Sequence, residues 1–200
     1  MKIATRAGTK LRRTFHSPNP AANVKRRNES VATDTLYAGC KAVDDGSLYA
    51  QFFCGRESLC IDAYGIKSPA HFIRTLWENI RRRGAMDLLI SDNAKTEIGK
   101  KARTVLQHMA IDNWSSEPEM QWQNYSERRY QNVKHNVQWI MNVFNVPRYA
   151  WLLVLFYVCF IMNRTAVQSL GWRTPIEVLT GETPDIGSTQ STCLKMRHWT

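Results

Sequence analysis

The chain has 200 residues, a length that suits one domain with a substantial core and excludes two full-size domains. Its 44% hydrophobic and 22% charged residues are ordinary for a globular protein and exclude wholesale disorder. The formal net charge is +10, but eight basic residues and no acidic one fall within the first 28, which leaves 19 basic and 17 acidic residues for the remainder. The excess charge therefore belongs mostly to one end of the chain.

That end has few large apolar residues and cannot bury enough surface to fold alone, so we expect residues 1–30 to be a flexible basic arm. Phosphate binding or nuclear import would suit such an arm, and a solvated tail without function is the alternative. An Arg-rich, acid-poor mitochondrial presequence is a further alternative, although no clear amphipathic period supports it.

Cysteine and hydropathy patterns exclude two further classes of protein. The five cysteines are too scattered for a disulfide scaffold and contain no Cys-x-x-Cys pair, so we expect reduced thiols and no zinc site. The run from Ala150 to Met162 is apolar but has only 13 residues, whereas a helix needs about 20 to span a bilayer. A short helix that is apolar on all sides usually lies in a protein core, so we expect no membrane partner.

The first half of the chain predicts three strands followed by a helix. Apolar or β-branched runs indicate strands at 31–37, 49–54 and 59–64. The tight turn between the second and third strands requires them to run antiparallel. Ser68-Pro69 is a helix start signal, and apolar residues at helical spacing continue to Arg83, before Gly84.

The second half alternates strands with helices. The predicted elements are a buried strand at 88–90, a helix at 95–108, a short strand at 110–111, a long amphipathic helix at 123–145, the apolar helix at 150–162, and a short helix at 175–180 that starts with a capping box. Strands joined through a crossover helix run parallel. The order therefore predicts an α/β domain with a mixed five-stranded sheet and helices on both faces.

Three acidic residues stand out by their positions. Asp34 lies inside the first strand, where Asp is disfavoured and burial without a partner is costly. Asp92 follows the buried strand at 88–90, at the carboxyl end where α/β proteins place ligand sites. Glu127 lies on the long helix. Each has a structural alternative: an ion pair with an arginine for Asp34, a turn cap for Asp92, and a solvated helix surface for Glu127.

Clustered carboxylates repel one another and stay together when divalent cations neutralise them. Hard oxygen ligands favour Mg²⁺ or Mn²⁺ over zinc, and two such ions can activate the attacking oxygen and stabilise the leaving oxygen of a phosphoryl displacement. The other acids are weaker candidates because of their positions. Asp44 and Asp45 lie in a turn, and Asp62 is expected at the surface of a strand edge. Glu97 lies on the following helix, and Glu117 and Glu119 lie in a loop.

The layout of the three acids resembles a known family. An acid on the first strand, an acid after the fourth and a Glu on a later helix is the arrangement of the ribonuclease-H-like polynucleotidyl transferases. The 34 residues between Asp92 and Glu127 resemble the Asp-Asp-Glu pattern of retroviral and retrotransposon integrases. Three local motifs are similar to copia-type long-terminal-repeat retrotransposons: Ser91-Asp92-Asn93-Ala94 with Glu97, Gln123-Asn124-x-x-Glu127-Arg128, and Thr174-Pro175-x-Glu177-x-x-Thr180-Gly181-x-x-Pro184-Asp185.

The resemblance implies an integrase catalytic core over residues 31–187, with a ribonuclease-H-like fold and metal-dependent DNA strand transfer or phosphodiester cleavage. Asp34 and Asp92 would hold Mg²⁺ or Mn²⁺, and Glu127 would complete the second metal site. Asn124, Arg128 and Lys134 would contact DNA. DNA and further copies of the chain are the expected partners, in the nucleus or the cytoplasm.

Lys134 lies seven residues after Glu127 and shares a helix stripe with it, as DNA-contacting basic residues of the family do. Gln131, on the same stripe, departs from that basic pattern, and a solvated Lys134 is the alternative reading.

The chain also departs from the family at its ends. Residues before 31 contain one His and no Cys, so we expect no His-His-Cys-Cys zinc module there. Residues 188–200 no longer resemble the family and are expected to be unstructured. We therefore expect an isolated catalytic core from a larger polyprotein. Two alternatives stay open: an inactive relic that only binds nucleic acid or self-associates, and a ribonuclease H or resolvase, whose usual fourth acid finds no match.

Overall fold

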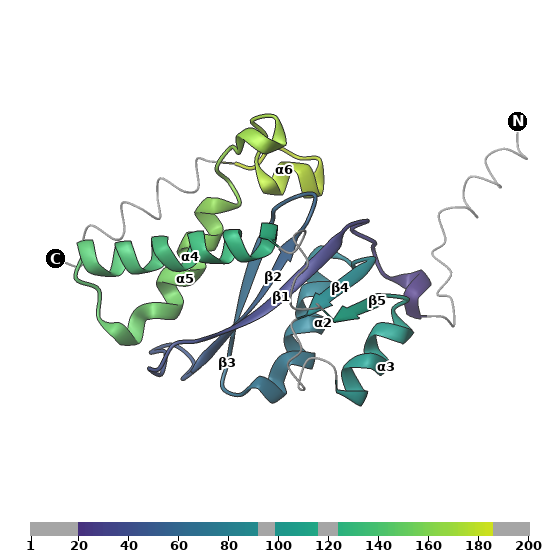
Figure 1. Cartoon of the computed structure of the whole chain (residues 1–200), viewed down its shortest axis with the longest axis horizontal. Helices are drawn as coiled ribbons and strands as arrows, with labels where there is room; N and C mark the ends of the chain where they lie inside the picture. The colour runs from purple at the N-terminus through teal and green to yellow at the C-terminus, as the bar shows by residue number, and fades with distance from the viewer. Residues whose placement is uncertain (1–19, 92–98, 116–123, 186–200) are drawn as a thin grey trace, which may run out of the picture.

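The computed structural model describes residues 20–91, 99–115 and 124–185, which form a mixed five-stranded sheet with helices on both faces (Figure 1). The strands are β1 (Ser30–Tyr37), β2 (Tyr49–Gly55), β3 (Ile61–Ile66), β4 (Leu88–Ser91) and β5 (Asp112–Ser115). Their order across the sheet is β3-β2-β1-β4-β5. The first three strands pair antiparallel, and β4 and β5 run parallel to β1. The predicted α/β fold class is confirmed.

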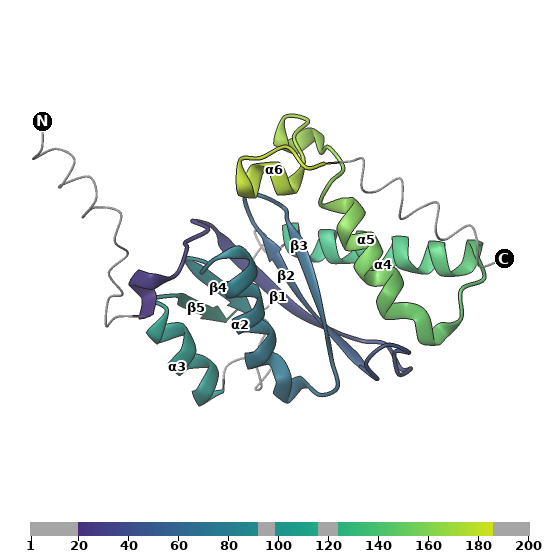
Figure 2. The same ribbon diagram turned by 180° about the vertical axis from the view of Figure 1, so that it is seen from behind.

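The helices divide between the two faces of the sheet (Figures 1 and 2). On one side lie α2 (Phe72–Arg83) and α3 (Lys100–His108), and on the other lie α4 (Asn124–Val143) and α5 (Trp151–Met162). The short helix α6 (Pro175–Thr180) follows α5. Four 3₁₀ turns complete the described elements, at Pro20–Asn23, Pro69–His71, Arg148–Ala150 and Gln168–Leu170.

Two apolar cores hold the layers together, one on each face of the sheet. On the first face, Phe53 of β2 and Leu89 of β4 pack with Phe72 and Leu76 of α2. On the second face, Phe52 of β2 packs with residues of α4 and α5, whose buried members include Tyr130, Val133, Leu152, Leu155 and Val158. The alternation of Phe52 and Phe53 between the two cores follows from the two-residue period of a strand.

Most predicted elements are confirmed, with differences at two strands. The third strand begins at Ile61 rather than 59, because Leu59 has a φ of 54° and still belongs to the preceding turn. The last strand lies at Asp112–Ser115 rather than 110–111, because Ala110 has a φ of 50° and turns the chain first. β5 is polar and lies at the edge of the sheet, so it lacks the apolar pattern that identifies a buried strand.

The capping box of α6 is present as predicted: the Glu177 backbone N–H donates to Thr174, and the Thr174 N–H donates to the Glu177 carboxylate. Gly181 ends this helix with a φ of 78°, a left-handed conformation that glycine adopts without strain.

The apolar run forms α5, and only part of its surface is covered. Trp151, Leu152 and Val158 are buried, whereas Leu153 and Phe156 are 46% and 38% exposed. The helix therefore packs in the core, as expected, but it leaves one side exposed. Within the described residues, no helix combines the length and the apolar character needed to cross a membrane.

Residues 20–30, which we expected to belong to a flexible arm, contact the core, and residues 1–19 and 186–200 lie outside the described residues. The Arg26 guanidinium donates to the backbone oxygens of Met109 and Ala110, at 2.8 and 3.0 Å, and lies 3.2 Å from Asp87. These contacts join the segment to the β4 and β5 side of the sheet.

A buried carboxylate, Glu29, organises the start of β1. It accepts hydrogen bonds from the Arg27 guanidinium, from the backbone N–H groups of Glu57 and Ser58, and from the Ser58 hydroxyl. The side chains of Arg27 and Glu29 are 1% and 3% exposed. A Cβ atom at Gly55 would lie 2.5 Å from Glu29 Oε2, so the close approach of this turn requires glycine.

The sequence did not predict the burial of Asp62, but it did predict the reduced state of the core cysteines. Asp62, expected at the surface, is 4% exposed and accepts two hydrogen bonds from Arg83, at 2.8 and 2.7 Å. The cysteines of the core are free thiols, as expected. Burial raises the pKa of Cys54 and Cys60 to about 12 and also raises the pKa of Cys159, so these thiols stay protonated at neutral pH.

Replacing the buried Glu29 by Gln tests this account of the fold. Glu29→Gln leaves the Arg27 charge buried without its partner and sets an amide N–H₂ against backbone donors, so we expect a loss of about 3 kcal/mol in the free energy of unfolding. Glu78→Gln is the control, because Glu78 pairs with Arg74 at the surface and its loss should cost less than about 1 kcal/mol. Urea unfolding of both variants measures the difference, and equal stabilities would contradict the proposed role of Glu29.

Candidate active site

Asp34 lies where two parallel strands of unequal length end. The β1–β4 register ends with Thr33 paired to Ser91, while β1 continues to Tyr37 and stays paired to β2. Asp34 is therefore the first β1 residue beyond the end of β4. Carboxyl ends of parallel strands form the edge at which α/β sheets bind ligands.

The Asp34 side chain lies on the sheet face that carries α4. Asp34 pairs with Phe52, and paired residues of a ladder point to the same face. The Phe52 ring lies 5.3 Å from the ring of Tyr130 on α4. The strand and the helix thus place Asp34 under α4.

The Asp34 carboxylate meets a cation and a backbone donor. Its Oδ2 lies 3.8 Å from Lys134 Nζ, and its Oδ1 accepts a hydrogen bond of 2.8 Å from the Thr35 N–H. Both side chains of the ion pair are more than one third exposed, so water screens their attraction. Among the described residues, the cation that forms an ion pair with Asp34 is Lys134 rather than the arginine that we considered as an alternative.

A hydrogen-bond network on the other sheet face holds the backbone around Asp34. The buried Gln51 amide donates to Thr33 Oγ1 at 2.6 Å and to the Asp34 backbone oxygen at 3.1 Å, and its Oε1 accepts from Thr35 Oγ1 at 2.6 Å. Sequence reasoning missed Gln51. A polar residue at a buried position of a central strand is the signal that could have identified it.

Helix α4 is attached to the site by polar contacts in its first turns. Tyr130 is 4% exposed, and its hydroxyl donates to the Ala32 backbone oxygen at 2.9 Å. The Arg129 Nη2 donates to the Met162 backbone oxygen at the end of α5, at 3.1 Å. Burial lowers the pKa of Arg129. The sequence predicted an amphipathic helix here but did not reveal either hydrogen bond.

Glu127 lies in the first turn of α4 and is exposed. The Gln131 amide, one turn later, donates to Glu127 Oε1 at 3.4 Å. A carboxylate in a first helical turn is favoured by the helix dipole. Helix α4 begins at Asn124 and contacts β1 through Tyr130. Glu127 therefore lies at the start of the helix surface on which Lys134 contacts Asp34.

The structure brings together only part of the predicted site. Asp34 meets Lys134, and Glu127 lies on the same stripe of α4 as Lys134, whereas Asp92 lies outside the described residues. Within residues 20–91, 99–115 and 124–185, no three His, Cys, Asp or Glu side chains gather as metal ligands would. The predicted triad therefore stays a prediction. Carboxylate oxygens are the donors that Mg²⁺ prefers, so Asp34 and Glu127 each have the chemistry of a divalent-ion ligand.

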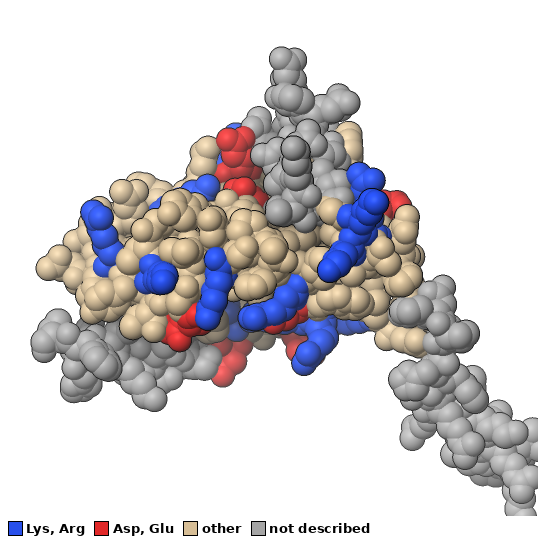
Figure 3. Space-filling model, turned by 90° about the horizontal axis from the view of Figure 1, so that it is seen from below, with Lys and Arg blue, Asp and Glu red and all other residues tan. Residues whose placement is uncertain are grey.

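The predicted DNA contacts are described to different extents. Arg128 and Lys134 are exposed on α4, while the Asn124 side chain lies outside the description. On the face seen in Figure 3, the described Lys and Arg side chains stand at separate points, several beside Asp or Glu. That face therefore shows dispersed charge rather than one broad basic surface.

The sheet order, its mixed strand directions and the helices on both faces define the ribonuclease-H-like fold of integrase catalytic cores. Comparison of the sequence with protein-family models gives no match, and neither does comparison with curated proteins. Solved structures give the likeness.

One similar structure is a chain of the simian T-cell lymphotropic virus intasome in complex with the PP2A regulatory subunit B56 gamma, with a TM-score of 0.63 and 15% identity over 80% of this chain. The present chain spans 56% of that one. A second is the catalytic core domain of BIV integrase, with a TM-score of 0.60 and 14% identity over 76% of this chain and 93% of that chain. A third is the HTLV-2 integrase catalytic core domain in complex with magnesium, with a TM-score of 0.59 and 12% identity over 76% and 96%. At these identities the likeness shows the fold.

Removing the Tyr130 hydroxyl tests how α4 is held over β1. Tyr130→Phe leaves the buried Ala32 oxygen without this donor, so we expect the free energy of unfolding to fall by about 1 kcal/mol. Hydrogen exchange in the first turns of α4 should also become faster. Tyr149→Phe is the control, because Tyr149 is 53% exposed. A Tyr130→Phe variant with unchanged stability and unchanged exchange would refute the anchoring.

Proposed function

We propose that this chain is the catalytic core of a retrotransposon integrase, of the copia type that its motifs resemble, and that it catalyses divalent-metal-dependent DNA strand transfer and phosphodiester cleavage. The observation that carries the proposal is the register of β1 and β4. Thr33 pairs with Ser91, and the residue that follows each of them in the sequence is an aspartate, Asp34 and Asp92. Two acids that follow paired residues of neighbouring parallel strands are well placed to share a cation.

In the proposed site, Asp34, Asp92 and Glu127 would hold one or two Mg²⁺ or Mn²⁺ ions. Such ions would make an oxygen nucleophile available and neutralise charge on the phosphodiester. The magnesium in the HTLV-2 core supports this choice of metal. The protein itself would orient the carboxylates: Gln51 steadies the Asp34 backbone, and Tyr130 fixes the helix that carries Glu127.

DNA is the proposed substrate. Arg128 and Lys134 are exposed cations on the helix of Glu127, and Asn124 begins that helix. Lys134 also lies against Asp34, so a phosphate that it binds would lie next to the proposed metal site. The likeness to a chain of the simian T-cell lymphotropic virus intasome supports this assignment.

The chemistry can be tested on the full chain with a duplex carrying a recessed 3′-hydroxyl and a plasmid target. We expect Mg²⁺- or Mn²⁺-dependent joining that stops when the metal is chelated. Asp34→Asn and Asp92→Asn should each lower the rate by more than about a hundredfold, because each removes a metal ligand. Asp44→Asn is the matched control, since Asp44 is an exposed acid in the β1–β2 connection.

Two outcomes would contradict the proposal. Joining that survives in both Asp34→Asn and Asp92→Asn would exclude the proposed metal site. An absence of metal-dependent joining, together with salt-sensitive DNA binding that persists in Asp92→Asn, would favour the inactive relic instead.

Self-association is the second part of the proposed function. The outward side of α5 exposes Leu153 and Phe156, and large apolar side chains in one place usually mark an interface. The dimeric and trimeric forms of the HTLV-2 core support a homo-oligomer. We propose that copies of this chain meet through the outward side of α5.

A charge on this side of α5 should weaken the association. We expect Leu153→Glu to raise the dissociation constant of the oligomer at least tenfold, because the carboxylate would be desolvated at the contact. Trp172→Glu is the control, since Trp172 is 70% exposed and lies outside α5. Sedimentation equilibrium measures both, and a similar loss in the two variants would argue against α5 as the interface.

A further inference from the structure

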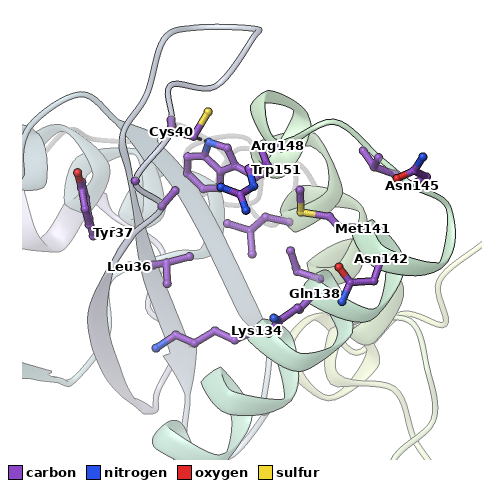
Figure 4. A pocket seen from close by; sticks show the side chains of 15 residues that line it. Leu36, Tyr37, Cys40, Lys134, Gln138, Met141, Asn142, Asn145, Arg148 and Trp151 are labelled. Carbon is purple, nitrogen blue, oxygen red and sulfur yellow. Dashed lines mark hydrogen bonds between the residues drawn. The ribbon is translucent and has the colours of Figure 1, made fainter.

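A cavity of about 720 Å³ lies beside Asp34, between the end of β1, the second half of α4 and the start of α5 (Figure 4). We propose that it holds one unpaired nucleotide of the DNA substrate. This inference rests on the proposed function and names the part of the DNA that the site would recognise. The volume falls within the roughly 300–1,000 Å³ of pockets that take small molecules.

The charge of the cavity wall favours an anionic occupant. Lys134 and Arg148 both line the cavity, and no Asp or Glu does so among the described residues. Lys134 Nζ is also the atom that lies 3.8 Å from Asp34 Oδ2, so the cavity and the candidate active site share a wall. A phosphate bound by these cations would connect a nucleotide in the cavity to a strand at Asp34.

The polar side chains on α4 suit the edge of a nucleobase. Gln138 and Asn142 of α4 line the cavity four residues apart, which puts them on one stripe of the helix, and Asn145 lines it from just beyond the helix end at Val143. Each amide offers both donors and an acceptor, as base edges require. Figure 4 shows Lys134, Gln138 and Asn142 along the side of α4 that borders the cavity.

The remaining wall is apolar and fixed in place. Leu36, Met141 and Leu155 line it, and they offer a surface for the face of a base. The Trp151 indole N–H donates to the Cys40 backbone oxygen at 2.9 Å, which attaches the β1–β2 connection to α5. The Val43 N–H donates to the Tyr149 oxygen at 2.8 Å and holds the same connection. The cavity is therefore formed before any ligand binds.

An unpaired nucleotide fits this shape better than duplex DNA. A stacked base pair presents only its edges in a groove, whereas a cavity with an apolar wall and an amide edge needs a base that has left the stack. Phosphates of the duplex, which stays outside the cavity, would still contact Lys134. The cavity should thus recognise a single-stranded end that continues from the duplex at Asp34.

Binding of the full chain to two DNA probes tests the inference. One probe is a blunt duplex and the other carries a short single-stranded 5′ extension. We expect the wild type to bind the extended probe about tenfold more tightly, as base contacts of this kind are typically worth. Gln138→Ala and Asn142→Ala should reduce that preference, and Met141→Trp, which fills the cavity, should abolish it. Affinity for the blunt duplex should change little in all three.

Asn132→Ala is the matched control, because Asn132 is an exposed amide of α4 that does not line the cavity. Equal affinity of the wild type for both probes, or a preference that survives in Gln138→Ala and Asn142→Ala, would overturn the inference. If the wild type joins DNA without such a preference, the proposed function stands and the cavity is not a nucleotide site. If the preference follows the cavity variants but no joining occurs, the nucleotide site stands and the proposed chemistry fails.

Discussion

The candidate site depends on the parallel pairing of β1 with β4 beneath a helix that is anchored to β1. β4 ends at Ser91 while β1 continues, so Asp34 lies at a step in the sheet rather than between two strands. Tyr130 then fixes α4 over the same strand two residues before Asp34, which sets the position of Lys134 and of the turn that carries Glu127. A one-turn shift of α4 would separate these groups.

The sequence predicted the architecture because apolar periodicity and turn chemistry are local signals. The strand run at 31–37, the Ser68-Pro69 start and the capping box at Thr174 all have physical causes within a few residues. The same signals could not identify contacts between distant segments. Glu29 is held by residues 28 and 29 positions later in the chain, and Tyr130 bonds to a strand 98 residues earlier. Asp62 appeared to be a surface residue because its partner, Arg83, lies 21 residues away.

Lys134 connects the electrostatics of the site with its shape. Without bound ligands, its ammonium partly neutralises Asp34, which limits the repulsion that clustered carboxylates would otherwise suffer. A divalent cation at Asp34 would compete with this ammonium for the same oxygen. Lys134 could then turn toward a phosphate, because the flexible stem of lysine allows its charge to move by several ångströms. Metal binding at Asp34 would thus free Lys134 to bind a DNA phosphate, so the binding of metal and the binding of DNA would favour each other.

Arg129 explains why the position of α4 is specific. Apolar packing of α4 against the sheet would tolerate more than one axial position, because large apolar side chains recur along the helix at every turn. Burial of a guanidinium is unfavourable, and the Arg129 Nε has no hydrogen-bond partner among the described residues. The arginine is nevertheless satisfied in part by the Met162 oxygen, at the helix end where carbonyl groups lack partners within α5. A one-turn axial shift of α4 would break this contact and leave the buried charge without it, so the contact favours the observed placement of the turn that carries Glu127.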